Sequence, residues 1–124
     1  MLVRIDFESD VALYIQLRDQ IIMGIATETI KNGESLPSVR QMAEEIGINM
    51  HTVNKTYALL REEGFITLDR RNGAVVKLDV DKIKAVKCLK EDMKVVLAKA
   101  IAKNISKEEA LEVVNEIYTE YGDL

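Results

Sequence analysis

Two amphipathic helical patterns in the middle of the chain lie so close together that they constrain the fold more than any other feature. The first pattern begins at Ser38, which follows a proline and forms a capping box with Gln41, and it stops at Gly47. The second pattern runs from about Met50 to Glu63 and ends before another glycine. Two helices joined by such a short, glycine-containing turn form a helix-turn-helix unit.

The segment after this unit alternates apolar and polar residues, which is typical of a β-hairpin. Residues 65–68 and 74–78 predict two strands, and the Asn-Gly dipeptide between them is a strong hairpin signal. A further helix is predicted before the unit, over about residues 11–29, because its apolar residues recur at helical spacing. Three helices followed by a hairpin predict a winged helix-turn-helix domain over residues 1–78.

Residues 79–124 differ in character and contain two more amphipathic patterns. One helix is predicted from Asp81 to about Lys103, and another follows the capping box of Ser106 and Glu109. A helical pair of this size cannot cover both of its apolar stripes, so it needs a partner surface, and a second copy of the chain is the simplest partner. We therefore expect a homodimer held together by Ile83, Val86, Leu89, Met93, Leu97, Ile101, Leu111, Val114, Ile117 and Tyr118. The predicted fold is mainly α with a small β-hairpin wing (α+β) and a two-helix dimerisation tail.

The composition excludes several classes of protein. Hydrophobic residues make up 48% and charged residues 31% of the 124 residues, as in a globular protein. The longest apolar run, residues 21–26, is too short for a membrane span, and the N-terminus lacks an apolar signal core, so we expect a cytoplasmic protein. One cysteine and one histidine exclude a disulfide framework and a four-ligand zinc site within one chain. Since no catalytic motif or phosphate-binding loop occurs either, we expect no cofactor and no enzymatic activity.

The charge distribution permits nucleic-acid binding only in the middle of the chain. The net charge is −4, yet residues 31–78 hold seven basic and six acidic residues, while the flanking segments are acidic on balance. This small excess allows binding to DNA without arguing for it.

The helix predicted from Met50 carries polar side chains near its start. Because Val53 must point inward, its polar neighbours lie on or beside the outward face, where they can reach base edges in a major groove. The two arginines at the hairpin tip serve no core, and an arginine that enters a minor groove reads its width. The arginine in the first turn of the preceding helix is a surface residue with little role in stability. The expected DNA-binding residues are Ser38, Arg40, Asn49, Met50, His51, Thr52, Asn54, Lys55, Arg70, Arg71, Asn72 and Gly73.

The expected phosphate contacts also predict how salt affects binding. Arg40, Lys55, Arg70 and Arg71 in each of two protomers give about eight phosphate contacts, so log affinity should fall with log salt at a slope of about −7. Lys31 and Lys77 are weaker candidates for such contacts.

Three sequence motifs carry a resemblance to a known family. They are Leu36-Pro37-Ser38-Val39-Arg40, Thr52-Val53 and Glu63-Gly64-Phe65-Ile66. With these motifs, residues 13–76 resemble the DNA-binding domain of the GntR family of bacterial transcription regulators, and the short helical tail resembles its YtrA-type subfamily. The resemblance implies a homodimer that binds a pseudo-palindromic operator in double-stranded DNA, usually as a repressor of its own operon. It further implies that the arginine at position 40 lies against DNA and that the operon encodes a membrane transporter, as is frequent in the YtrA-type group.

Other interpretations stay open at this point. His51 could instead bind a metal or respond to pH. Cys88, which lies among lysines, could be a redox sensor or a plain packed or partly buried thiol. The winged helix could also be a protein-interaction module without specific DNA binding. An unidentified small-molecule effector could control the protein, and it would have to lie between protomers or between the tail and the winged helix.

Overall fold

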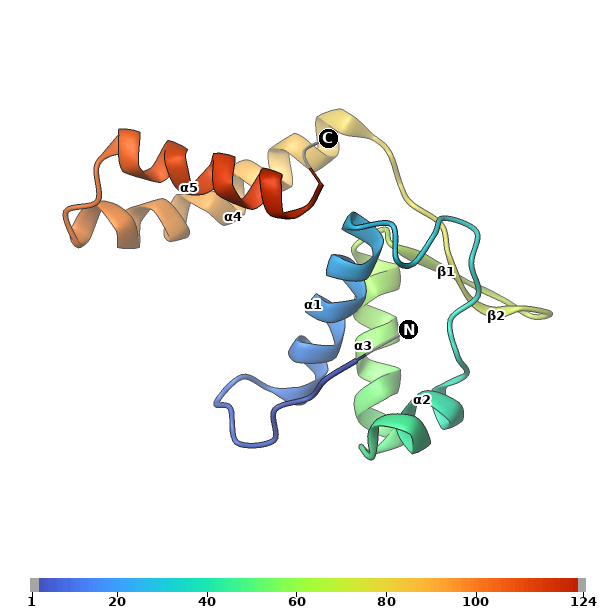
Figure 1. Ribbon diagram of the computed structural model, residues 1–124. Helices are drawn as coiled ribbons and strands as arrows, with labels where there is room; N and C mark the ends of the chain where they lie inside the picture. Colours follow the sequence, from blue (N-terminus) through green and yellow to red (C-terminus); the bar gives the residue numbers. More distant parts are fainter. Residues whose placement is uncertain (1–2, 123–124) are drawn as a thin grey trace. The chain divides into compact units, whose positions relative to one another are not determined.

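The computed structural model describes residues 3–122, which form five helices and one two-stranded antiparallel sheet (Figure 1). The chain divides into two units, Met1–Asp79 and Val80–Leu124. The fold class predicted from the sequence is confirmed, because a helix-turn-helix and a hairpin precede a helical pair. The elements are α1 (Leu13–Ala26), α2 (Val39–Ile46), α3 (Met50–Glu62), β1 (Ile66–Asp69), β2 (Gly73–Val76), α4 (Lys82–Ala102) and α5 (Lys107–Glu120).

The turn between α2 and α3 is fixed by local hydrogen bonds, as its sequence predicts. The Ser38 hydroxyl accepts the backbone N–H of Gln41 at 3.1 Å, and the Gln41 side chain accepts the backbone N–H of Ser38 at 3.0 Å. Gly47 ends α2 with a φ of 75°, in the left-handed region that favours glycine. Asn49 then caps α3 by accepting the backbone N–H of His51 at 2.7 Å. These caps hold the two helices close together.

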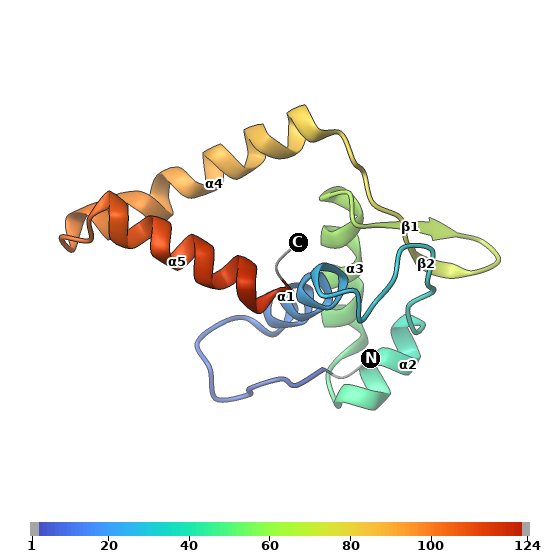
Figure 2. The ribbon, with the colours of Figure 1, turned by 45° about the horizontal axis from the view of Figure 1, so that its top comes forward.

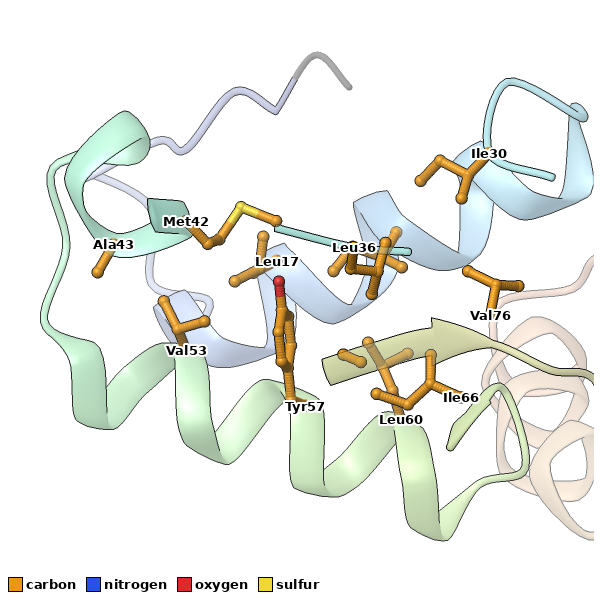
Figure 3. Close-up of a cluster of buried hydrophobic side chains, with 12 residues drawn as sticks. Leu17, Ile30, Leu36, Met42, Ala43, Val53, Tyr57, Leu60, Ile66 and Val76 are labelled. Atoms are coloured by element: carbon orange, nitrogen blue, oxygen red, sulfur yellow. The ribbon is translucent and has the colours of Figure 1, made fainter. Parts of the chain in front are cut away.

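One apolar core joins α1, α2, α3 and the hairpin (Figure 3). Two hydrogen bonds from α3 fix this packing: Thr56 donates to the Tyr14 carbonyl of α1 at 2.9 Å, and the Tyr57 hydroxyl donates to the Pro37 carbonyl before α2 at 2.7 Å. Burial raises the pKa of Tyr57 above its usual range, and the negative charge of Glu45 adds to this shift. The buried apolar residues are Leu17, Ile21, Ile30, Leu36, Met42, Ala43, Val53, Tyr57, Leu60, Ile66, Ala74 and Val76.

The first helix is shorter than the predicted range of 11–29. It begins after Ala12, whose side chain provides no cap. It ends early because Glu28 adopts a φ of 61°, which is incompatible with a right-handed helix. The apolar periodicity predicted the helix correctly but did not contain the information that sets its ends.

The predicted hairpin is confirmed, and its strands lie within two residues of the expected ranges. Its register pairs Asp69 with Gly73, so three residues form the turn. Gly73 has a φ of 69°, whereas Asn72 does not have a positive φ, and this combination fits a three-residue turn rather than a two-residue Asn-Gly turn. Figures 1 and 2 both show this turn extending away from the three helices of its unit.

The second unit consists of α4 and α5, which begin where the sequence predicts. Asp81 caps α4 by accepting the backbone N–H of Lys84 at 3.2 Å, and Ser106 and Glu109 form the second capping box. Asn104 separates the helices with a φ of 62°. Neither helix contains a buried residue. Among residues 3–122, no helix has the length and apolar character that a membrane crossing requires.

Candidate nucleic-acid interface

The first turn of α2 presents Ser38 and Arg40, both of which are exposed. The hydroxyl and the backbone N–H of Ser38 are used in the capping box, so this residue fixes the position of the turn. Arg40 forms no ion pair within the part of the chain that the structure describes. Its guanidinium is therefore available to an external anion or to a base edge.

The first two turns of α3 present most of the predicted polar side chains. Met50, His51 and Asn54 are exposed, whereas Thr52 is half-buried and lies on the flank of the helix. The side chain of Asn49 is used as the helix cap. Because the first backbone N–H groups of a helix lack intrahelical partners, this end of α3 also favours a nearby phosphate.

Lys55 lies one turn further along α3 and is held by a residue of α1. Its ammonium nitrogen is 3.9 Å from the centroid of the Tyr14 ring, which is a cation–π contact. Lys55 is exposed all the same. The contact thus restricts where the charge lies without removing it from solvent.

The tip of the hairpin presents Arg70 and Arg71, both exposed and without an ion pair among residues 3–122. The Asp69 carboxylate accepts the backbone N–H of Arg71 at 2.8 Å and the side-chain amide of Asn72 at 3.3 Å. The hydrogen bond from Arg71 is the main cause of a lowered pKa at Asp69, with the bonds from Asn72 contributing less. Together with the left-handed Gly73, these bonds fix the shape of the turn that carries the arginines.

An open hollow of about 410 Å³ brings α2, α3 and β1 together. We call it the α3–β1 hollow, and its lining residues are Val39, Asn54, Lys55, Tyr57, Ala58, Arg61 and Leu68. Arg61 was not among the predicted site residues. The signal that identifies it is helical spacing, since residues 54, 58 and 61 lie on one face of a helix.

The helical tail presents a second candidate surface, which is apolar. Of the predicted dimerisation residues, Met93 and Val114 are half-buried. Ile83 and Ile101 are 85% and 71% exposed, which is far more than such side chains usually show in a folded protein. The other exposed members of the predicted set are Val86, Leu89, Leu97, Leu111, Ile117 and Tyr118.

The surroundings of His51 and Cys88 bear on a metal-binding or redox role for these residues. Within residues 3–122, no three His, Cys, Asp or Glu side chains gather as metal ligands would. Cys88 is a free thiol and is exposed on α4, so within one chain it is neither packed nor partly buried.

Residues 13–76 match the family described as bacterial regulatory proteins, gntR family. Among curated proteins, the chain is 29% identical over 121 residues to the HTH-type transcriptional regulator YhcF of Bacillus subtilis, covering 94% of this chain and 97% of YhcF. It is 35% identical over 75 residues to the HTH-type transcriptional repressor YtrA of Bacillus subtilis, covering 60% of this chain and 58% of YtrA. The chain therefore spans nearly all of one relative and less than two thirds of the other.

Solved structures show the same fold. YtrA from Sulfolobus acidocaldarius, a GntR-family transcription factor, superposes with a TM-score of 0.69 at 38% identity, covering 82% of this chain and 99% of that one. A transcriptional antiterminator from Listeria monocytogenes gives a TM-score of 0.85 at 22% identity, covering 98% and 92%, and this likeness concerns the fold alone. AraR(DBD) in complex with operator ORX1 gives a TM-score of 0.52 at 19% identity, covering 60% and 95%, again for the fold alone.

Proposed function

Since the chain belongs to the GntR family of bacterial regulatory proteins and to its YtrA-type branch, we propose that it binds a pseudo-palindromic operator as a homodimer and represses the operon that contains its own gene. It is a transcriptional regulator with the DNA-binding domain of that family. The observation that carries the proposal is that α2, α3 and β1 line one open hollow while exposed cations lie on α2, on α3 and at the hairpin tip.

In the proposed complex, the first turns of α3 enter a major groove. His51 and Asn54 then reach base edges, and the N-terminus of α3 lies near a phosphate. Arg40 contacts a phosphate or a base edge from the first turn of α2. Arg70 and Arg71 reach the neighbouring backbone or minor groove from the hairpin tip. The solved complex of AraR(DBD) with operator ORX1, which has the same fold, supports this use of the domain.

The homodimer is proposed because the tail exposes apolar side chains on both α4 and α5. Covering them with a second copy gives a two-fold arrangement, and two-fold symmetry matches a pseudo-palindromic site. Its two DNA-binding units would then bind half-sites about 34 Å, or one helical turn, apart.

Repression is proposed because the relative YtrA of Bacillus subtilis is a transcriptional repressor. A dimer bound to a promoter blocks access to that promoter. Since the DNA lies in the cytoplasm, the proposed repressor acts there. In this proposal the operon encodes a membrane transporter, as is frequent in the YtrA-type group, and an unidentified small molecule releases the DNA.

Fluorescence anisotropy with DNA from upstream of its own gene, compared with a scrambled duplex of equal length, tests the proposal. We expect tight binding to the first duplex and a slope of log affinity against log salt of about −7. A slope shallower than about −2 would contradict the proposed phosphate contacts. Weak binding that does not distinguish the two duplexes would instead favour a protein-interaction module.

A further inference from the structure

An exposed arginine that belongs to none of the family motifs, Arg61, lines the α3–β1 hollow. Asn54, Ala58 and Arg61 follow one another at spacings of four and three residues, so their side chains form one stripe along α3. At 1.5 Å per residue this stripe is about 10 Å long. It leads from the part of α3 proposed to read bases to the C-terminal turn of the helix.

The hollow is also lined by Lys55, whose ammonium lies over the Tyr14 ring, while its remaining walls are largely apolar. Val39 contributes from α2, and Leu68 contributes from β1 with 54% of its surface exposed. One nucleotide of a DNA strand offers groups that match both kinds of wall. Its phosphate suits the planar, bidentate guanidinium of Arg61, and its deoxyribose carbons suit the apolar side chains.

Arg61 forms no ion pair with the two glutamates that follow it in the sequence, Glu62 and Glu63. Glu63 is bound by Arg18 at 3.7 Å, and Arg18 also contacts Asp19 at 2.7 Å. No acidic side chain in residues 3–122 forms an ion pair with Arg61. A cation in the last turn of a helix also stabilises that end of the helix, but this role requires no anion in the hollow.

We infer that Arg61 binds a backbone phosphate of the operator in the α3–β1 hollow. This inference rests on the proposed function and adds one contact per protomer to it. Two protomers then make about ten phosphate contacts instead of about eight, so the slope of log affinity against log salt becomes about −9 instead of about −7.

The salt dependence of the full chain on DNA from upstream of its own gene tests this contact. Arg61→Gln should make the slope shallower by about 1.8, because two phosphate contacts are lost. Arg61→Lys should keep the slope and bind more weakly than the wild type, since lysine offers a point charge in place of a bidentate group. Lys99→Gln, which removes an equal charge from α4, should leave the slope unchanged. A purely structural role of Arg61 would change stability but not the slope.

A second pair of variants tests the hollow without changing Arg61. Leu68 and Thr67 are both exposed, and as neighbours on a strand they point to opposite faces. Leu68→Glu places a carboxylate where the phosphate would lie and should lower operator affinity by about tenfold or more, whereas Thr67→Glu adds the same charge on the other face and should lower it much less.

The outcomes separate this inference from the proposed function. The inference is overturned if Arg61→Gln leaves the salt slope unchanged, or if the two glutamate variants lose operator affinity equally. In either case, specific binding by the wild type still supports the proposed function. If the wild type binds operator and scrambled duplex equally, the proposed function fails and the inference fails with it.

Discussion

Replacing Tyr57 by phenylalanine should lower stability at neutral pH and raise it, relative to the wild type, at alkaline pH. Tyr57 is 4% exposed, and its hydroxyl donates to the Pro37 carbonyl at 2.7 Å. Losing one such hydrogen bond lowers the free energy of unfolding by about 1 kcal/mol. Burial, however, also raises the pKa of Tyr57, and this effect opposes folding at high pH.

The size of the alkaline effect follows from proton linkage. Because the folded-state pKa is raised, the stability contributed by Tyr57 is complete below the unfolded pKa and is lost as the pH rises toward the folded value. The unfolded chain ionises this phenol near its ordinary pKa of 10.0, while the folded chain keeps it neutral. At about pH 11 the free energy of unfolding of the wild type is therefore lowered by about 1.4 kcal/mol through this phenol, and the phenylalanine variant has no such loss. The two stability curves should cross between about pH 10 and 11.

Urea unfolding of both full-length proteins, followed by far-UV circular dichroism at several values from about pH 7 to 11, measures this difference. Taking the difference between the proteins cancels the titration of all other groups. A stability difference that stays constant across this range would refute the argument that a buried, neutral phenol links α3 to the segment before α2.

Three further predictions concern binding. Asp69→Ala should lower operator affinity severalfold and lower the urea midpoint only slightly, because the exposed turn that carries Arg71 loses the hydrogen bonds that fix its shape. In the wild type these bonds are complete above the ordinary Asp69 pKa of 3.8 and are lost as the pH falls through the lowered folded value. Ile101→Glu places a charge on the proposed dimer face, so sedimentation velocity should show a monomer and operator affinity should fall about a hundredfold or more. A dimer that persists in this variant would contradict the proposed interface. Asn54→Ala should lower the discrimination against a wrong base at one position of each half-site by about 1–3 kcal/mol, measured by competition with base-substituted operators. An equal loss of affinity on every duplex would exclude base readout by Asn54.

The features that were predictable from the sequence are those set by neighbouring residues. The capping boxes at Ser38 and Ser106 and the left-handed Gly47 are local, and each lies where its motif indicates. The apolar periods also give the correct sequence of helices and strands. These signals suffice to predict the winged helix because the turn that joins α2 to α3 is only a few residues long.

The features that were not predictable depend on packing between distant segments. Thr56 bonds to a carbonyl 42 residues away, and Lys55 lies over the ring of Tyr14, so neither partner can be deduced from local spacing. Arg61 likewise becomes a site residue only when β1 closes one side of the hollow. Helix ends without a strong cap, such as that near Glu28, are set by backbone conformation that periodicity does not encode.

The acidic balance of the chain determines how the proposed interface must work. A net charge of −4 gives little long-range attraction to DNA, and at physiological salt charges are screened beyond about 8 Å in any case. Affinity must then come from arginines and lysines that touch the duplex, several of which lie on α2, on α3 and at the hairpin tip. Because non-specific binding depends almost entirely on such phosphate contacts, affinity for random DNA should fall with salt as these contacts predict. Discrimination between the proposed operator and other sequences must then come from base contacts of α3, because phosphate contacts carry no sequence information.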